Sequence, residues 1–401
     1  MSRTRQRGRH APHTDRLHLA RILALRITHL RLENWRNFRS VDVSLQDRSF
    51  LVGPNASGKS NFLDALRFLR DLATVGGGFE KAVTQRDGVS RLRCLFARRQ
   101  SDIAFDVVLS DESVETWRYR LSFTQDKQRR PIITDEQVWH LGKSLRRRPD
   151  RQDQTDRELL RQTHLEQVSA NREFRTIAEF FASIRYYHIV PQLVREPDRS
   201  VGRVADPFGG DFLEQLYRTN PSVRQSRLRR IEKALQVAVP QLAELVLERD
   251  DRGVPHLRGR YEHWRPGAGW QNEKDFSDGT LRLLGLLWAL LDGSGPLLLE
   301  EPELSLHSGV VRYVPELMAR VQHRQSRQIL VSTHSSELLG DEGIAPDEVL
   351  LFTPTRNGTV VESGAAIGEV RDLLDSGLTV ADAVVPRTRP DTADRITSLL
   401  E

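Results

Sequence analysis

The sequence "SFLVGPNASGKSNFLDALRFL", residues 49–69, places a glycine-bearing loop between an apolar segment and a helix-like pattern. Residues 53–60 fit the spacing G-x-x-x-x-G-K-[ST]. Residues 50–52 favour a strand that runs into the loop, and apolar residues recur behind it at helical spacing. This strand–loop–helix context is the one in which the pattern binds phosphate. A chance match is the alternative, and the flanking elements disfavour it.

The chemistry of such a loop depends on its backbone and on two side chains. Backbone N–H groups point at the phosphates, aided by the positive end of the following helix. Lys59 adds a positive charge against the β- and γ-phosphates, and Ser60 supplies a hydroxyl to Mg²⁺. We therefore predict a nucleotide site formed by Gly53, Pro54, Asn55, Ala56, Ser57, Gly58, Lys59, Ser60 and Asn61.

A second motif, "GPLLLEEPELSLH" at residues 295–307, ends a run of leucines in two adjacent carboxylates. Carboxylates at the carboxyl end of a buried parallel strand lie where such sheets bind ligands. We assign Glu300 to the metal and Glu301 to the general base that takes a proton from the attacking water. A solvated acidic turn is the alternative.

Two further motifs are ambiguous when taken alone. In "DFSDGTLRLLGLLWALL", Ser277, Asp278 and Gly279 precede an apolar helix, which is typical of a plain N-cap but also of an anion site. In "RQILVSTHSSELL", a buried strand ends just before His334. That histidine could reach a γ-phosphate or the attacking water, or it could only cap a turn.

Taken in their order along the chain, the four motifs resemble those of ATP-binding-cassette ATPases, in the branch of SMC, RecF and OLD proteins. "GPNASGKS" resembles Walker A, "FSDGT" the signature, "LLLEEPE" Walker B and "STHSSEL" the H-loop. "LRLENWRNF" also resembles the N-terminal strand and turn of that branch, with Asn34 and Arg36 at characteristic positions near the nucleotide. The resemblance covers residues 22–90 and 270–352.

The sequence departs from the cassette pattern in three places. Glu300 stands where most cassettes carry aspartate, and Asp278 where transport ATPases carry glycine. His307 occupies the position of the usual aspartate in the dimer-facing loop. Gln85 is the best candidate for the Q-loop glutamine. The divergent signature argues against a transporter subunit.

The resemblance implies a mechanism in which two protomers sandwich two ATP molecules with Mg²⁺. Ser277 and Gly279 of one protomer would contact the γ-phosphate held by Lys59 of the other. ATP binding would close this homodimer and hydrolysis through Glu301 would reopen it, which is a two-state element biased by the γ-phosphate.

The pattern along the chain predicts an α/β fold of the P-loop, ABC ATPase type, with a mixed sheet flanked by helices. We divide it into a basic, mobile extension (1–21), an N-terminal half of the core (22–100), an inserted α+β arm (101–270) and a C-terminal half (271–401). Strands are expected at 91–99, 102–110 and 115–123, and a charged helix around 159–168 that continues toward residue 181.

Composition restricts the class of protein. Apolar residues make up 38% and charged residues 29%, and no run approaches the roughly 20 apolar residues of a membrane span. The lone Cys94 excludes an internal disulfide and favours a reducing, cytoplasmic location. The net charge of +5 is consistent with nucleic-acid contact or with an arginine-favouring genome. The basic extension could be a nucleic-acid arm, a targeting peptide or an over-extended start.

We expect an ATPase that senses or clamps DNA and controls a separate effector protein, in antiviral defence or DNA repair. Only 67 residues follow His334, too few for the Toprim nuclease of OLD proteins. A RecF-like repair loader without an effector is the alternative, and a transport ATPase is a more distant one.

Overall fold

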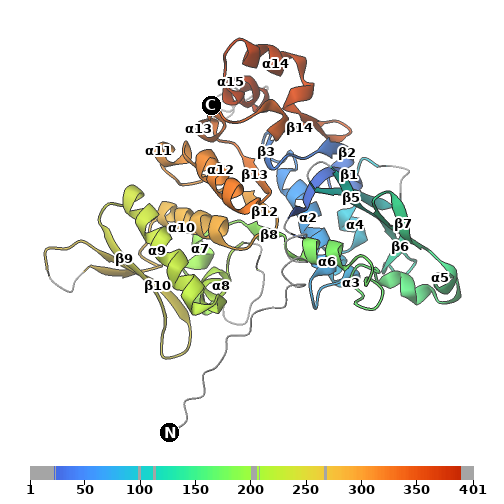
Figure 1. The fold of residues 1–401 in the computed structure, drawn as a ribbon, viewed down its shortest axis with the longest axis horizontal. Coiled ribbons are helices and arrows are strands. Elements are labelled where there is room, and N and C mark those ends of the chain that lie inside the picture. The colour runs from blue at the N-terminus through green and yellow to red at the C-terminus, as the bar shows by residue number, and fades with distance from the viewer. Residues whose placement is uncertain are drawn as a thin grey trace, which may run out of the picture.

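The computed structural model describes residues 22, 24–97, 101–111, 114–199, 206, 208–265 and 269–389. The basic extension predicted at 1–21 lies outside them. The described chain is α/β, with two six-stranded sheets and one three-stranded sheet (Figure 1). The predicted fold class is confirmed. Among the described residues, no helix combines the length and apolar character needed to cross a membrane.

The mixed sheet carries the motifs. Its strand order is β15-β14-β3-β13-β12-β8, and all neighbours are parallel except β15. The three central strands, β3, β13 and β12, are buried on both faces, as parallel strands usually are. Their bounds are β3 (Arg48–Val52), β8 (Arg185–Tyr187), β12 (Leu297–Glu300), β13 (Ile329–Thr333), β14 (Val349–Thr355) and β15 (Gly358–Ser363).

The second large sheet is antiparallel, in the order β2-β1-β4-β5-β6-β7. Its strands alternate buried and exposed side chains, because one face covers the core and the other faces solvent. Their bounds are β1 (Arg26–Trp35), β2 (Phe38–Ser44), β4 (Ile103–Asp111), β5 (Val114–Gln125), β6 (Pro131–His140) and β7 (Lys143–Arg148).

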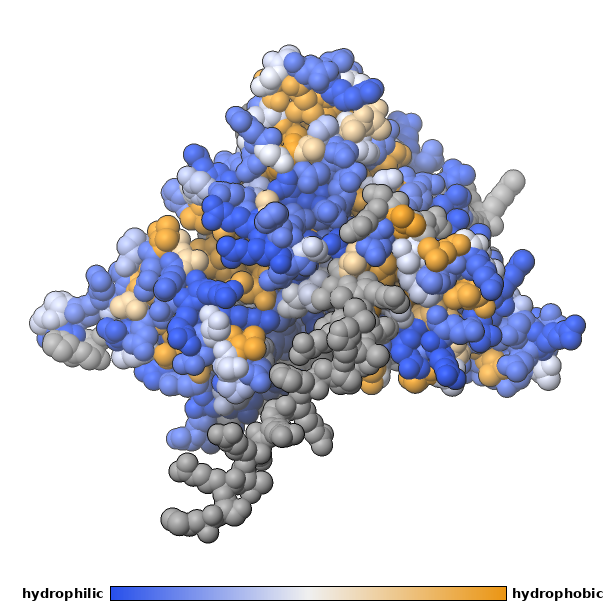
Figure 2. Space-filling model, in the orientation of Figure 1, coloured by the Kyte–Doolittle hydropathy of each residue, from blue (hydrophilic) through white to orange (hydrophobic). Residues whose placement is uncertain are grey.

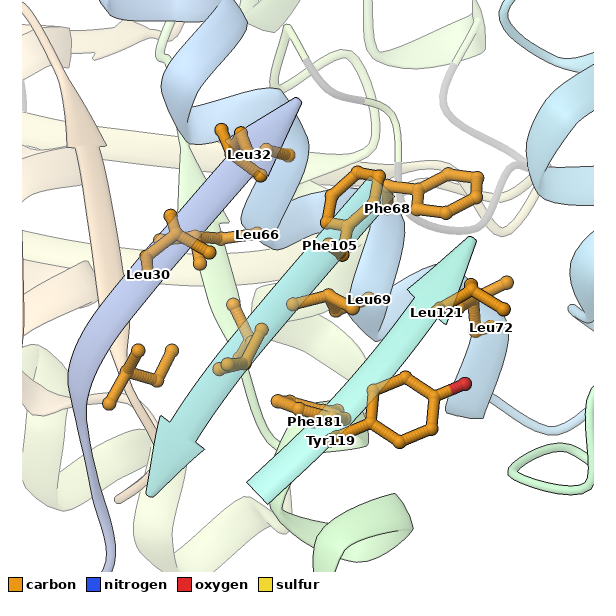
Figure 3. Close-up of a cluster of buried hydrophobic side chains, with 14 of the residues drawn as sticks. Leu30, Leu32, Leu66, Phe68, Leu69, Leu72, Phe105, Tyr119, Leu121 and Phe181 are labelled. Atoms are coloured by element: carbon orange, nitrogen blue, oxygen red, sulfur yellow. The ribbon is translucent and has the colours of Figure 1, made fainter. Parts of the chain in front are cut away.

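The helix α2 (Lys59–Ala73) lies between the two large sheets and packs against both (Figure 1). Figure 3 shows the interdigitation, in which Leu66, Phe68, Leu69 and Leu72 of α2 meet side chains of β1, β4 and β5. Phe68 stacks on Phe105 with ring centroids 5.2 Å apart. Because α2 begins at the glycine-rich loop, this core fixes the position of the helix to which the loop leads.

A second core lies on the other face of the mixed sheet. It is built by α10 (Asp278–Leu291), α12 (Val314–Gln325), α8 (Phe212–Arg218) and α9 (Pro221–Ala238). The three-stranded sheet belongs to this side and consists of β9 (Leu242–Arg249), β10 (Pro255–Tyr261) and β11 (Trp270–Asn272). The other α-helices bounded within the described residues are α3 (Phe79–Thr84), α4 (Val89–Leu92), α5 (Arg151–Thr155), α6 (Arg175–Ala182), α7 (Pro191–Val194), α11 (Ser308–Val311), α13 (Ser336–Leu339), α14 (Gly368–Asp375) and α15 (Val380–Val384).

The strand expected at 91–99 is wrong. Helix α4 follows Gly88 and buries Val89 and Leu92, which are three residues apart and share one helical face. After it, Arg93 makes only an isolated bridge to Trp35. Residues 98 and 99 lie outside the described residues.

The helix expected around 159–168 is also wrong. Residues 157–161 form one 3-10 turn, and α6 begins only at Arg175. The guanidinium of the buried Arg148 donates to the carbonyl oxygens of Leu159 and Gln162, at 2.9 and 2.8 Å. These carbonyls are therefore taken by a side chain. Strands β6 and β7, at 131–148, are an addition that the sequence interpretation missed.

The residues predicted as an insert contribute to both large sheets. Strand β4 pairs with β1, and β8 pairs with β12 at the edge of the parallel sheet. The division at residues 100 and 270 stays a prediction.

On the face in Figure 2, hydrophilic residues predominate and apolar ones form separate groups, one of them over the C-terminal elements.

Candidate functional site

The phosphate loop, residues 53–60, joins β3 to the start of α2 and is braced by the β1–β2 turn. Gly58 has φ 99°, and an added Cβ would lie 2.1 Å from Nδ2 of Asn37, so only glycine fits. Asn37 donates to the carbonyl of Ser57 at 2.9 Å and accepts from Asn61 at 2.8 Å. The first turn of α2 has no side-chain cap. Its N–H groups are therefore available to an anion.

Lys59 curls back over this loop. Its ammonium donates to the carbonyls of Gly53 and Pro54 at 2.8 and 3.1 Å. Only 6% of the residue is exposed. Burial lowers the pKa of Lys59 to about 8, against the opposing pull of Glu301, Glu300 and Glu303. A charged phosphate in the loop would favour the protonated form.

Ser60 and Glu300 meet from different elements. The Ser60 hydroxyl at the start of α2 donates to Oε1 of Glu300 at 2.5 Å. Oε2 of Glu300 accepts from the hydroxyl of Tyr186 on β8. Burial, followed by the charge of Glu300, raises the pKa of Tyr186, so its hydroxyl keeps its proton. Hydroxyl and carboxylate oxygens are the donors that Mg²⁺ prefers, so this pair fits the ion.

Glu301 and His334 lie at the ends of neighbouring strands β12 and β13. Nε2 of His334 is 3.0 Å from Oε1 of Glu301. Glu301 has φ 43°, and its N–H donates to the Ser332 carbonyl at 3.0 Å. The hydrogen bond to His334 lowers the pKa of Glu301, assisted by the charges of His334 and Lys59. The lowered pKa keeps the carboxylate of Glu301 ionised beside the loop.

Sequence reasoning missed Glu303, which holds His334 in place. Its Oε1 accepts from Thr333 Oγ1 at 2.6 Å and from the N–H of His334 at 3.2 Å. The carboxylate is buried, and burial raises its pKa. His188 was also missed: its Nδ1 lies 4.0 Å from Oε2 of Glu300. No local pattern around Tyr186 or His188 indicates these contacts, which join distant segments of the chain.

The signature turn, residues 277–279, opens α10. The hydroxyl of Ser277 accepts from the N–H of Thr280 at 3.1 Å, as an N-cap does. Asp278 pairs with Arg195 at 2.5 Å. An added Cβ on Gly279 would lie 2.6 Å from the carbonyl of Ser305. Within the described chain, no hydrogen bond or ion pair joins this turn to the phosphate loop of the same protomer.

The structure places the remaining candidates as follows, and their roles at the nucleotide stay predictions. Arg36 has φ 54° and donates to Asp64 on α2 at 2.9 Å. Asn34 is buried and bonds the backbone of Cys94 and Asp102. Gln85 is exposed beside α3 and lines a cavity of about 1160 Å³ away from Ser60 and Glu300. His307 caps α11, accepting from Gly309 N at 3.0 Å.

A family model described as "AAA domain, putative AbiEii toxin, Type IV TA system" matches residues 48–340. The chain belongs to this family. The match runs from β3 to α13, so this AAA-domain chain carries the phosphate loop, Glu301 and His334 inside the matched region.

Curated relatives match this AAA-domain chain over short stretches. Endonuclease GajA of Bacillus cereus is 34% identical over 67 residues, 17% of this chain and 12% of that protein. A DNA replication and repair protein RecF, from Picosynechococcus sp., is 33% identical over 90 residues, 22% of this chain and 23% of that protein. The chain therefore matches less than a quarter of the length of these relatives.

Solved structures confirm the fold over most of the chain. An SMC head bound to the C-terminal winged-helix domain of ScpA has a TM-score of 0.53 at 14% identity, covering 84% of this chain and 97% of that one. An Smc head with an extended coiled coil, bound to the C-terminal domain of ScpA from Pyrococcus furiosus, has a TM-score of 0.50 at 13% identity and covers 88% and 99%. The predicted membership of the ABC-type SMC/RecF/OLD-like ATPases is confirmed.

Proposed function

We propose that the chain binds ATP with Mg²⁺ at the phosphate loop and hydrolyses it. One observation carries this proposal: the carboxyl ends of three adjacent parallel strands, β3, β13 and β12, bring together Lys59, His334 and Glu301. Ligands bind at such strand ends in α/β sheets. A general base, a buried cation and an uncapped helix start thus share one edge.

Each side chain has a separate task in this proposal. The loop N–H groups and Lys59 hold the β- and γ-phosphates. Ser60 and Glu300 hold Mg²⁺, which supplies charge neutralisation of the phosphates. Glu301 takes the proton from the attacking water, because its lowered pKa keeps it ionised. His334 orients Glu301 through their 3.0 Å contact.

We propose further that two copies close around two ATP molecules. Residues 277–279 of one copy would complete the site that the loop of the other begins. In the described chain, residues 277–279 make no hydrogen bond or ion pair with the phosphate loop of their own protomer. This separation supports the proposal that they act on the loop of a second copy. Closure would depend on the γ-phosphate, which couples ATP binding to a change in assembly.

The cycle is proposed to sense or clamp DNA and to control a separate effector, in defence or repair, in the cytoplasm. The relatives named for DNA repair and as an endonuclease support a DNA substrate, and the family description names a toxin–antitoxin system. A RecF-like loader is the alternative. A transport ATPase is disfavoured by Asp278 in the signature turn.

The test incubates the purified chain with Mg²⁺, ATP and duplex or gapped DNA. We expect phosphate release that depends on Lys59, DNA binding that depends on ATP, and no DNA cleavage. Robust cutting by the chain alone would overturn the separate effector. ATP-dependent binding restricted to gapped DNA would favour the loader. No phosphate release under any condition would overturn the ATPase assignment.

A further inference from the structure

Glu300 is held at both of its carboxylate oxygens. Oε1 accepts from Ser60 on α2, and Oε2 accepts from Tyr186 on β8. Only 12% of the Glu300 side chain is exposed, so these two hydroxyls define its position. A carboxylate bonded at both oxygens loses the rotational freedom that it would otherwise have.

The strand register explains why Tyr186 reaches this carboxylate. In the parallel pairing of β8 with β12, Tyr186 is opposite Leu298. Glu300 lies two residues after Leu298 and therefore points to the same face of the sheet as Tyr186. The phenol ring extends forward to Oε2. An aspartate at position 300 would be one methylene shorter, which would draw its carboxylate back toward the strand and away from both hydroxyls.

Tyr186 is itself held by α2, the helix that also presents Ser60. The guanidinium of Arg67 lies 4.3 Å from the centroid of the Tyr186 ring. Arg67 is 3.7 Å from Asp64, and Asp64 is 2.9 Å from Arg36 in the β1–β2 turn. The ring is thus clamped to the element that carries the other proposed metal ligand.

We propose that Tyr186 is a positioning residue for the metal ligand Glu300. The Tyr186 hydroxyl occupies Oε2 of Glu300 and so directs Oε1 toward Ser60. Oε1 and the hydroxyl oxygen of Ser60 are then presented to Mg²⁺ together. The longer glutamate and the tyrosine act as a pair that replaces the shorter carboxylate of most cassettes. This inference rests on the proposed binding of Mg²⁺ and ATP.

The test measures metal coupling rather than turnover. The affinity for a non-hydrolysable ATP analogue is measured by calorimetry with Mg²⁺ and with EDTA, and the ratio of the two is the coupling. In Tyr186→Phe we expect the ratio to fall about tenfold while the metal-free affinity is unchanged, since residues that orient ligands typically contribute that much. Tyr187→Phe is the matched control. Tyr187 also lies on β8 and its hydroxyl also donates to a carboxylate, but this carboxylate is that of Asp292, at 2.8 Å.

A double-mutant cycle adds a second readout. Glu300→Asp already breaks the contact with Tyr186, so adding Tyr186→Phe should lower the ratio less than twofold further. Unchanged coupling in Tyr186→Phe, an equal loss in Tyr187→Phe or additive losses in the cycle would overturn the positioning role while leaving ATP binding intact. If the unchanged chain fails to bind the analogue, both this inference and the proposed function fail.

Discussion

The imidazole of His334 lies 3.0 Å from the carboxylate of Glu301, at the ends of two neighbouring parallel strands. The backbone N–H of His334 donates to Oε1 of Glu303 at 3.2 Å. The histidine is therefore supported before any nucleotide enters. This arrangement places a hydrogen-bonded, ionised carboxylate beside the phosphate loop, where the proposed mechanism requires a proton acceptor.

Glu301→Gln should retain ATP binding and lose hydrolysis by about 10² to 10⁴-fold, because glutamine cannot take the proton. The variant should also stay in the ATP-bound assembly for longer. Single-turnover phosphate release and sedimentation with ATP measure the two effects. Normal turnover would refute the base assignment, and Glu362→Gln on β15 serves as a control outside the site.

Nucleotide affinity should fall as the pH rises above about 8. The free chain holds Lys59 at a pKa of about 8, lowered by burial, so the ammonium loses its proton above that value. Bound phosphates favour the charged form, so binding takes up a proton and the loss approaches tenfold per pH unit. Calorimetry in buffers of different ionisation enthalpy measures the proton uptake. Lys59→Met should bind weakly with a flat profile between pH 7.5 and 9.5; a slope that survives in it would assign the effect elsewhere.

Arg195→Ala should weaken ATP-dependent assembly several-fold. Arg195 lies 2.5 Å from Asp278 and neutralises a carboxylate that the proposed dimer brings toward the partner's phosphates. The additional change Asp278→Asn should restore assembly, because it removes the uncompensated charge. Light scattering with and without ATP compares the single and double variants. A double variant as weak as Arg195→Ala would show that the charge is not the cause.

Arg148→Met should lower the free energy of unfolding by about 3 to 5 kcal/mol, because it leaves buried carboxylates without their cation. Arg148 is 1% exposed and pairs with Glu136 at 3.3 Å and Asp153 at 2.5 Å. Urea unfolding measures the change. The neighbouring Arg147 is exposed, so Arg147→Met should alter the free energy by no more than about 0.5 kcal/mol.

The strand–loop–helix arrangement around residues 53–60 could be predicted from the sequence because it depends on neighbouring residues. Gly58, Lys59 and the apolar face of α2 are adjacent in the chain, and each obeys a short-range rule. The position of Glu300 and Glu301 at the end of a buried strand could be predicted in the same way, since the two carboxylates directly follow an apolar run. Whether Glu300 and Ser60 make the proposed metal site remains a prediction, although the two side chains do meet.

The rest could not be predicted because it depends on contacts between distant segments. Tyr186 belongs to a three-residue strand 114 positions before Glu300, and nothing in "RYY" indicates that neighbour. Near residue 160, where the predicted helix is absent, the guanidinium of Arg148 donates to the carbonyls of Leu159 and Gln162 from another part of the chain. Local periodicity contains neither fact.

The strand order of the mixed sheet has a consequence for synthesis on the ribosome. The phosphate loop is translated early, but the strands beside it in the mixed sheet come much later, with Tyr186 at its edge and His334 just past β13. A nascent chain that carries only the loop and α2 has neither proton acceptor nor neighbouring strands. The proposed turnover of nucleotide therefore requires the chain to be made at least as far as His334, and a nascent chain that stops before that residue should lack it.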